Sequence, residues 1–390
     1  MSLALISRSW DLRRLRDDGY DIAIIANHLV IRGIPYVKAS GAVALGILVS
    51  ELTLGGDVTA RPSTHVAHFG GDYPCHSTGA PIEAIRHGSG RHEIGKGLFV
   101  DHSFSNKPPN GYPDYYEKMT RYVQIISSEA AAVDSTVAVR TYPIVTAGDD
   151  EVSPFLYLDT ASSRAGIYAI SQKLERLKKL AIVGVGGTGA YVLDLVAKTP
   201  VEEIHLFDGD SLLSHNAFRS PGAPSLEELR GRPWKVDYFA QVYGRMRKGI
   251  VPHRQFIDDS TVDELRHMDF VFICVDAGPG KRIAMANLQE WKVPFIDVGM
   301  GVNLVDGALG GVVRTTTFTP GEGDHIKHTI SIEPADENND YDQNIQVADL
   351  NALNATLAVI RWKKLFGFYR DLANSKSSYF VTDTDTLISE

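Results

Sequence analysis

A glycine-rich segment, Gly184–Gly189, lies between an apolar run and a helical pattern. Backbone N–H groups at the start of a helix bind phosphate well when no side chain obstructs them. The segment is therefore predicted to bind the phosphates of a nucleotide, through Gly184, Gly186, Gly187 and Gly189. Alone it is weak evidence, because many glycine-rich turns only connect a strand tightly to a helix.

An acidic residue follows this loop at a distance that suits a nucleotide site. Asp208 comes about 24 residues after Gly184, at the end of the apolar run Glu203–Phe207. A carboxylate at such a place can accept hydrogen bonds from ribose hydroxyls. On these residues alone, a dinucleotide-dependent oxidoreductase and an ATP-using enzyme both stay open.

Further motifs follow in a fixed order. They are the triplet Asp208-Gly209-Asp210, the segment Asn216-Ala217-Phe218-Arg219, the segment Gly231-Arg232-Pro233-Trp234-Lys235, and Asp276 after an apolar run. With the glycine loop, they resemble the ordered motifs of the ThiF/MoeB-type adenylyltransferases, the family that includes the ubiquitin-activating enzymes. Arg164 lies where that family carries an arginine ahead of its first strand. The resemblance covers about residues 160 to 365.

The resemblance implies an activity. A carboxylate would attack the α-phosphorus of ATP and release pyrophosphate. Because both reactants are anionic, catalysis of this kind is mostly positioning and charge neutralisation. The resemblance gives catalytic roles to Arg164, Arg219, Lys235 and Asp276, and Asp276 would also hold Mg²⁺, which binds one or two carboxylates together with phosphate oxygens.

The resemblance also implies how the nucleotide is bound and how the protein assembles. Asp208 would take the ribose, with Asp210 and Asn216 beside the nucleotide. In many family members the arginine equivalent to Arg164 reaches the site of the neighbouring subunit, so a homodimer is expected.

Three positions depart from the family pattern. His215 and Ser220 replace the family's Ser and Gln, and Ala277 replaces the Asn that usually follows the catalytic Asp. None of these changes removes a charged group, so adenylation chemistry is still expected.

The stretch that corresponds to the family's crossover loop, Thr315–Asp349, contains no cysteine. A thioester formed in this loop and a structural zinc held by paired cysteines are therefore excluded. The acidic part, Glu333–Asp342, is predicted to be a mobile loop. Three routes stay open for the acyl-adenylate: direct transfer to an acceptor, an oxyester on a hydroxyl such as Thr329 or Ser331, or a cysteine elsewhere in the chain.

The chain has two cysteines. Cys274 falls in a predicted buried strand and is expected in the core. Cys75 lies near His65, His68 and His76, a neighbourhood that could depress a thiol pKa or bind zinc. The spacing fits no established zinc pattern, so a structural or solvent-facing role is preferred, with a metal site and a reactive thiol as alternatives.

The elements that must position these residues alternate between strand and helix. Strands are expected at 180–183, 203–207, 269–275 and 294–299, with helices at 190–198 and near 350–360, where Leu350, Leu353, Leu357 and Ile360 share one face. This alternation predicts an α/β, Rossmann-like adenylation domain with a mostly parallel sheet over residues 151–390.

The first 150 residues are predicted to form an α+β domain for substrate or partner recognition. Ile22–Ile25 and Ala44–Val49 are apolar pieces of either strand or helix, and Tyr115–Ala132 has a helical pattern. The acidic, glycine-containing segment Ala147–Glu151 is the expected boundary.

Composition sets outer limits on the function. The chain has 390 residues, 44% of them hydrophobic, and 39 basic against 48 acidic residues, a net charge of −9. This charge disfavours a general nucleic-acid-binding protein. No apolar run is long enough to cross a bilayer, and the first residues do not have the pattern of a secretory signal, so a cytoplasmic protein is expected.

Together these patterns predict an ATP- and Mg²⁺-dependent adenylyltransferase that activates the C-terminal carboxylate of a ubiquitin-like protein, with a conjugating enzyme as further partner. A peptide or small carboxylate is the alternative substrate. Two other classes stay open: a nicotinamide-dependent oxidoreductase, and a catalytically silent scaffold that binds partners.

Overall fold

A computed structural model describes residues 2–95, 97–144, 153–165, 167–323, 325–332 and 345–390. The chain divides into two units: the first comprises Met1–Glu151 with Leu158–Gly166, and the second Val152–Tyr157 with Ile167–Glu390. The expected boundary at 147–151 and the acidic stretch at 333–342 lie outside the described residues. The predicted division of domains at residue 150 therefore stays a prediction.

The N-terminal unit contains an antiparallel sheet of six strands in the order β1-β2-β3-β6-β8-β7. Its elements are α1 Ser2–Arg8, α2 Trp10–Asp17, β1 Asp21–Ile25, β2 His28–Val37, β3 Val43–Glu51, β4 Leu54–Gly55, β5 Val58–Thr59, β6 Val66–Gly70, η1 Glu83–Ile85, β7 Arg86–Gly95, β8 Leu98–Ser105, α3 Tyr115–Val133 and α4 Thr160–Arg164. The α+β prediction for this part is confirmed, and the two ambiguous apolar pieces are the strands β1 and β3.

Helix α3, which was predicted as a helix from its sequence pattern, covers one face of this sheet. Tyr115, Met119, Tyr122 and Ile126 follow one another at spacings of three and four residues, so they share one helix face, and all are fully buried in the core of the unit. The helix begins after Asp114, whose side chain accepts a hydrogen bond from the Glu117 backbone N–H at 2.8 Å.

The second unit is built on a sheet of eight strands in the order β11-β10-β9-β12-β13-β14-β15-β16. Its elements are α5 Tyr168–Ser171, η2 Gln172–Leu174, β9 Lys179–Val183, α6 Gly187–Val196, β10 Glu203–Phe207, α7 Ser214–Ala217, α8 Leu226–Gly231, α9 Lys235–Tyr243, β11 Ile250–His253, η3 Val262–Leu265, β12 Phe270–Ile273, α10 Pro279–Glu290, β13 Phe295–Val305, β14 Ala308–Phe318, α11 Ile326–Thr329, α12 Ala348–Leu365, β15 Ser377–Val381, η4 Thr382–Thr384 and β16 Thr386–Ser389. Strands β11, β10, β9, β12 and β13 are parallel, and the last three are antiparallel. The predicted α/β, Rossmann-like fold with a mostly parallel sheet is confirmed.

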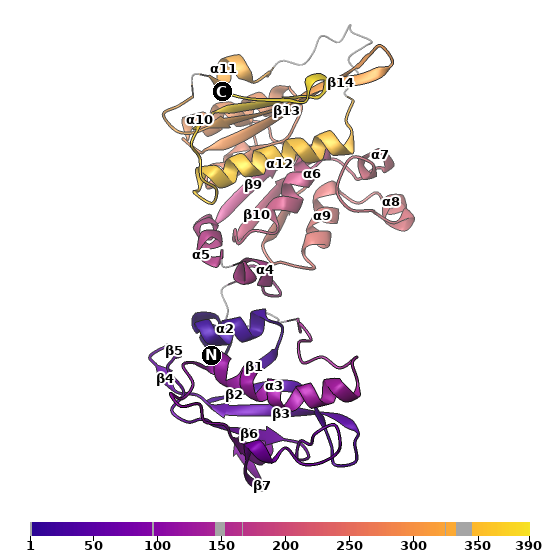
Figure 1. Ribbon diagram of the computed structural model, residues 1–390. Coiled ribbons are helices and arrows are strands. Elements are labelled where there is room, and N and C mark those ends of the chain that lie inside the picture. Colours follow the sequence, from indigo (N-terminus) through magenta and orange to yellow (C-terminus); the bar gives the residue numbers. More distant parts are fainter. Residues whose placement is uncertain (1, 96, 145–152, 166, 324, 333–344) are drawn as a thin grey trace. The chain divides into compact units, whose positions relative to one another are not determined.

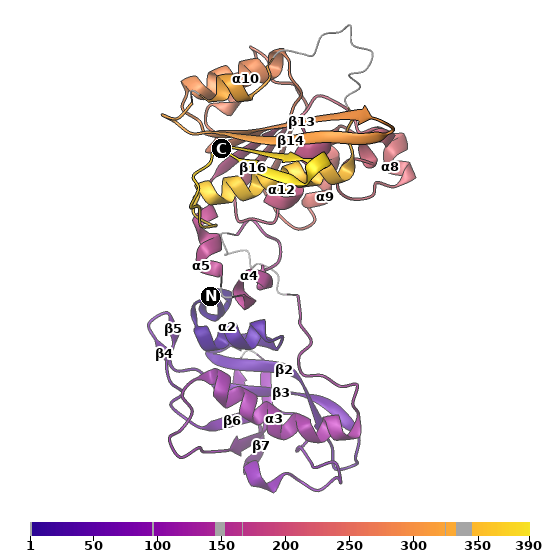
Figure 2. The same ribbon diagram turned by 45° about the horizontal axis from the view of Figure 1, so that its top comes forward.

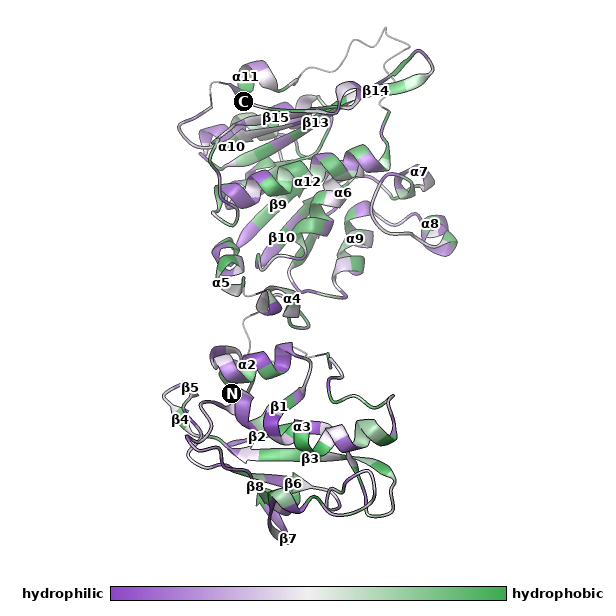
Figure 3. Ribbon diagram, in the orientation of Figure 1, coloured by the Kyte–Doolittle hydropathy of each residue, from purple (hydrophilic) through white to green (hydrophobic). Residues whose placement is uncertain are grey.

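Helices cover both faces of this sheet. Helices α6, α9 and α12 share one apolar cluster with one face, and α10, η3 and α11 share another cluster with the opposite face. Figures 1 and 2 show α12 along one side of the sheet and α10 on the other. The central strands are largely hydrophobic in Figure 3, as strands buried on both faces should be.

Two long strands, β13 and β14, form a hairpin that extends the sheet. It turns at Asp306 and Gly307, both with positive φ (50° and 80°), the backbone conformation that a tight two-residue hairpin turn requires. Only residues 294–299 of this region were predicted as strand. Within the described part of the chain, no helix has the length and apolar character that crossing a membrane requires.

Candidate active site

The glycine loop lies where the strand order of the second unit reverses. Strands β9 and β12 are neighbours, and the helices that follow them, α6 and α10, lie on opposite faces of the sheet. In open α/β sheets, ligands bind outside the carboxyl ends of the strands at such a reversal. The loop after β9 and Asp276 after β12 thus come to the same edge of the sheet, because Val183 and Ile273 are paired at the ends of these strands.

Close packing accounts for two of the predicted glycines. Gly184 has φ +86°, and a Cβ placed on it would lie 2.6 Å from Val275 Cγ1 and 2.8 Å from the Cys274 carbonyl oxygen. A Cβ on Gly189 would collide with the Gly184 carbonyl. Both positions therefore hold the loop tightly against the end of β12 and against the first turn of α6.

The other two glycines differ from each other. A Cβ on Gly187 would collide with the side chain of Asn351, which lies on α12. Gly186 precedes the first residue of α6, and a Cβ there would meet none of the described residues within 4 Å. No described side chain therefore obstructs this end of α6, which fits a phosphate group.

Asp208 connects the glycine loop to the next strand. Its buried carboxylate accepts hydrogen bonds from the backbone N–H of Val185 and of Asp210, both at 2.9 Å. It also lies 3.4 Å from the Lys235 ammonium. A carboxylate offers about four acceptor positions, so these contacts leave capacity for one more donor such as a ribose hydroxyl.

Lys235 lies between the two aspartates of the predicted triplet. Its ammonium is 2.7 Å from Asp210 Oδ2, and its side chain is only 8% exposed. The backbone N–H of Lys235 donates to the Asp210 carbonyl at 3.0 Å, which fixes the start of α9 beside the triplet. The structure thus brings Asp208, Asp210 and Lys235 together, with two of the three ammonium donors in use.

Asn216 and Arg219 each carry a buried donor that has no partner among the described residues. Asn216 lies on α7 and accepts a hydrogen bond from the Leu213 backbone N–H at 2.9 Å, but its Nδ2 donates to none of the described residues. The same holds for the buried Nε of Arg219. A buried unsatisfied donor costs about 1 to 3 kcal/mol, and an anionic or hydroxylated ligand would satisfy both groups.

A residue that the sequence analysis did not single out joins these segments. Asn351 is 1% exposed; its Oδ1 accepts from the Thr188 hydroxyl at 2.7 Å, and its Nδ2 donates to the Arg219 carbonyl at 3.4 Å. It thereby links the first turn of α6 to the loop of Arg219. The signal that could have found it is an amide beside Leu350 on the predicted apolar helix.

Asp276 and Arg164 have different surroundings. Asp276 is exposed in the loop between β12 and α10, at the same edge of the sheet as the glycine loop. Arg164 belongs to the N-terminal unit, where its guanidinium lies 5.4 Å from the centre of the Tyr142 ring. Arg164 and the other predicted site residues thus belong to different units of the chain.

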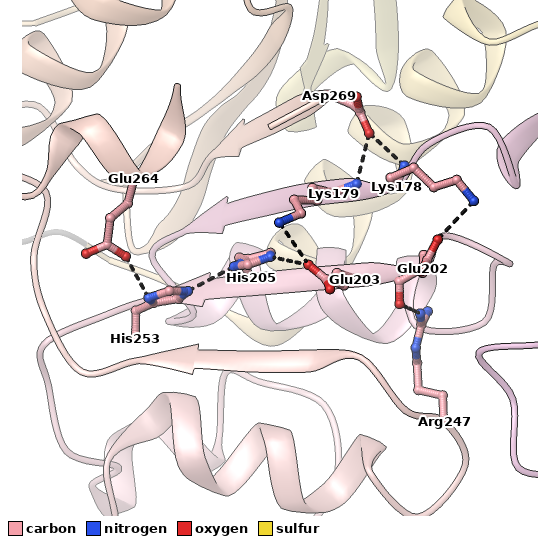
Figure 4. Close-up of polar contacts among 9 residues, drawn as sticks. All are labelled: Lys178, Lys179, Glu202, Glu203, His205, Arg247, His253, Glu264 and Asp269. Carbon is pink, nitrogen blue, oxygen red and sulfur yellow. Dashed lines mark hydrogen bonds and ion pairs between the residues drawn. The ribbon is translucent and has the colours of Figure 1, made fainter. Parts of the chain in front are cut away.

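A polar network connects β10, which ends directly before Asp208, with the neighbouring strand β11 (Figure 4). His205 Nδ1 lies 3.0 Å from His253 Nε2, and Glu203 and Glu264 bind the outer nitrogens of the two rings at 3.1 and 2.8 Å. Burial lowers the pKa of His253, and the hydrogen bond from His205 lowers the pKa of Glu203. The His253 carbonyl accepts from the Asp208 N–H at 3.3 Å, so this network holds the backbone of the site.

Buried charges lie on the other side of β12. Asp297 on β13 is fully buried and lies 2.6 Å from both the Lys281 ammonium and the Arg314 guanidinium. None of the three was singled out from the sequence.

Neither cysteine has the surroundings of a reactive thiol. Burial raises the pKa of Cys75, whose thiol donates to the Tyr73 carbonyl at 3.4 Å. Burial and the Asp297 carboxylate raise the pKa of Cys274. His76 pairs with Glu129 at 2.9 Å, and among the described residues no group of three or more His, Cys, Asp or Glu side chains could hold a metal ion.

Comparisons with known proteins agree with the motifs. A family model described as the ThiF family matches residues 161–377, and one described as a domain of unknown function (DUF6791) matches residues 10–160. No curated protein matches the chain.

Several solved structures are distantly similar. The crystal structure of E. coli MccB with MccA-N7isoASN is 19% identical, with a TM-score of 0.48 over 59% of this chain and 69% of that chain. E. coli MccB with ATP has the same identity and coverage and a TM-score of 0.44. PaaA is 14% identical, with a TM-score of 0.44 over 57% of this chain and 75% of that chain.

The ThiF match spans more than half of the chain and includes every motif of the predicted site. It favours adenylation over the nicotinamide-dependent alternative, for which Arg219, Lys235 and Asp276 would have no common purpose. The chain belongs to the ThiF family of adenylyltransferases, as its motifs predicted.

Proposed function

We propose that this chain uses ATP to adenylate the C-terminal carboxylate of a ubiquitin-like protein. The observation that carries the proposal is the end of α6 at Gly186, which no residue in the described part of the chain obstructs, next to the buried pair of Asp208 and Lys235 and two buried donors without a partner in that same part. The ubiquitin-like substrate rests on the family resemblance. The N-terminal unit is proposed to recognise the substrate or its acceptor.

The nucleotide would lie across the carboxyl edge of the sheet. The N–H groups at the start of α6 would bind its phosphates, and Asp208 would use its remaining acceptor position for the ribose. Asn216 Nδ2 and Arg219 Nε, for which the described ranges of the chain supply no acceptor, would donate to the ligand.

The chemical step needs charge neutralisation. A carboxylate oxygen of the substrate forms a bond to the α-phosphorus, and the bond from that phosphorus to the bridging oxygen of pyrophosphate breaks. The products are the acyl-adenylate and pyrophosphate. Arg219 and Lys235 would offset negative charge that the two anionic reactants bring together, and positioning would supply most of the remaining rate enhancement.

Asp276 is the residue proposed to hold Mg²⁺. Magnesium usually binds one or two protein carboxylates and fills its other positions with phosphate oxygens and water. A single exposed carboxylate at the nucleotide edge fits that mode. The ion would supply further positive charge at the phosphates.

The fate of the acyl-adenylate is proposed to be direct transfer to an acceptor. The Thr329 hydroxyl donates to the His325 carbonyl, which cannot act as a base toward it. Both cysteine thiols have raised pKa values. These surroundings favour direct transfer over an intermediate on Thr329 or on either cysteine.

The test is ATP–pyrophosphate exchange with the full chain and a panel of ubiquitin-like proteins, short peptides and amino acids. Exchange is expected only with a ubiquitin-like protein whose C-terminal carboxylate is free. Asp276→Asn is expected to lower the exchange rate by about 100-fold, the typical loss for one group that stabilises a transition state. Asp306→Asn, a matched change at an exposed hairpin turn, is expected to leave it unchanged.

Other outcomes would assign the chain differently. Exchange with a short peptide or an amino acid, but with no ubiquitin-like protein, would replace the proposed substrate class. Tight ATP binding without any exchange would identify a silent scaffold. Full exchange in Asp276→Asn would remove Asp276 from the mechanism.

A further inference from the structure

An exposed aromatic ring lies beside the residues proposed to bind ribose. Phe256 follows β11, and 59% of its surface is exposed. Single exposed apolar side chains are common on protein surfaces, so exposure alone assigns nothing. The position of this ring does point to a ligand.

The ring lies against the backbone between the two aspartates of the triplet. A Cβ placed on Gly209 would lie 2.6 Å from Phe256 Cε2 and 2.7 Å from its Cδ2. Only glycine at this position admits the ring. Phe256 is therefore in direct contact with the segment that carries Asp208.

The loop that presents the ring is held in place. The Thr261 hydroxyl donates to the Phe256 carbonyl at 2.8 Å, and Asp258 accepts from the Ser260 backbone N–H at the same distance. The next residue, Ile257, is 5% exposed, and its carbonyl oxygen lies 2.7 Å from where a Cβ on Gly280 would be. These contacts hold the backbone that carries the ring, with Ile257 packed against the start of α10.

Three neighbouring strands present three kinds of group in spatial order. The glycine loop follows β9, Asp208 follows β10, and Phe256 follows β11. Adjacent strands lie about 4.8 Å apart, a spacing similar to that between the phosphate, ribose and base of a nucleotide. A nucleotide with its phosphates at the end of β9 and its ribose at the end of β10 would therefore have its base near the end of β11.

We infer that Phe256 is the stacking surface for the purine base of ATP, with Gly209 kept small to admit its ring; this inference rests on the proposed function. Phe218 is more exposed, at 83%, but it lies at the end of α7, whereas Phe256 contacts the glycine beside Asp208. A planar base has a π-face that stacks on an aromatic ring.

The test is calorimetric titration of the full chain with ATP and, separately, with inorganic tripolyphosphate. Stacking of a base on an aromatic ring typically changes the dissociation constant by about 5- to 150-fold on replacement by alanine. Phe256→Ala is expected to weaken ATP binding by that factor and to leave tripolyphosphate binding unchanged. Phe256→Trp is expected to keep the affinity for ATP.

Gly209→Ala tests the same contact from its other side. Gly209 does not have a positive φ, so alanine fits its backbone, but the new Cβ would displace the ring. It is expected to behave like Phe256→Ala. Phe99→Ala, at a half-exposed position of the N-terminal unit, is the matched control, and melting temperatures without ligand check that all variants fold.

The outcomes separate this inference from the proposed function. Wild-type chain that fails to bind ATP would contradict both. Wild-type binding with equal ATP affinity in Phe256→Ala would overturn the stacking surface alone. An equal loss of ATP and tripolyphosphate binding would also overturn it, because the ring would then act on the phosphate site.

Discussion

At the scale of single residues, Lys118 shows how burial changes an ionisable group. It is fully buried in the N-terminal unit, where its ammonium donates to the Ser50 hydroxyl at 2.8 Å and to the Thr64 carbonyl at 2.9 Å. Burial lowers its pKa to about 8, while the Glu51 carboxylate opposes the shift. The charged form is therefore disfavoured in the folded state.

This shift predicts a pH dependence of stability. The pKa of Lys118 is lower in the folded than in the unfolded chain, so the unfolded chain binds more protons between about pH 8 and 10.5. The free energy of unfolding is therefore expected to increase as pH rises through this window. Below the window, the full cost of burying the charged ammonium lowers the stability. Urea denaturation of wild type and Lys118→Met across the window measures the difference.

The rise in unfolding free energy with pH is expected to disappear in Lys118→Met. It should persist in Lys248→Met, the control that changes an exposed lysine. Parallel stability curves for wild type and Lys118→Met would contradict the prediction.

Most charged residues of the candidate site were predicted from the sequence, because their types recur in a fixed order. Asn351 was missed, since an amide on an apolar helix face has no periodic signal, and only the fold places it against Thr188. Phe256 was missed for a similar reason: its contact with Gly209 joins two loops that follow different strands.

At the scale of elements, Arg247 stabilises the turn between α6 and β10. It is 1% exposed, and its guanidinium donates to the carbonyls of Thr199 and Glu202, both at 3.1 Å, and also to that of Val201. Burial lowers its pKa to about 10. Figure 4 shows the contact with Glu202.

Arg247→Lys is therefore expected to destabilise the second unit, although lysine keeps the positive charge. An ammonium has three donors on a flexible stem, whereas the planar guanidinium has five, so buried carbonyls would lose their partners. The expected loss in the free energy of unfolding is about 2 to 4 kcal/mol. Denaturation in urea, with the exposed change Arg245→Lys as control, measures it; equal losses in both variants would refute the assigned role.

The elements themselves were predicted unevenly. The strands β9, β10 and β12 are buried on both faces, so each is a short apolar run that the sequence reveals. The hairpin of β13 and β14 contains Gly299, Gly301, Gly310 and Gly311, which obscure any alternation of apolar residues. The pairing of β14 with β15 over residues 312–316 joins segments distant in the chain, a contact that local sequence does not encode.

At the scale of the whole molecule, the homodimer expected from the family resemblance makes a prediction about Arg164. If its guanidinium acts in the site of a second copy, Arg164→Ala and Asp276→Asn would each lower exchange strongly when present alone. A mixture would form mixed dimers with one intact site each. Re-assembly from equal amounts is then expected to restore about a quarter of wild-type exchange.

The assembled mixture must be compared with each variant at the same total concentration, and its mass checked by light scattering. A dimer without restored activity would place Arg164 in the site of its own chain, and a monomeric chain would contradict the homodimer.

The raised pKa values of both native thiols have a practical consequence. Maleimide and iodoacetamide react with thiolates, and Cys75 and Cys274 both have raised pKa values that keep them protonated near neutral pH. The two native cysteines are therefore expected to react slowly with a labelling reagent directed at an introduced cysteine. A fluorophore on a cysteine introduced at the exposed Leu226, on α8, could follow nucleotide binding in real time without removal of either native cysteine.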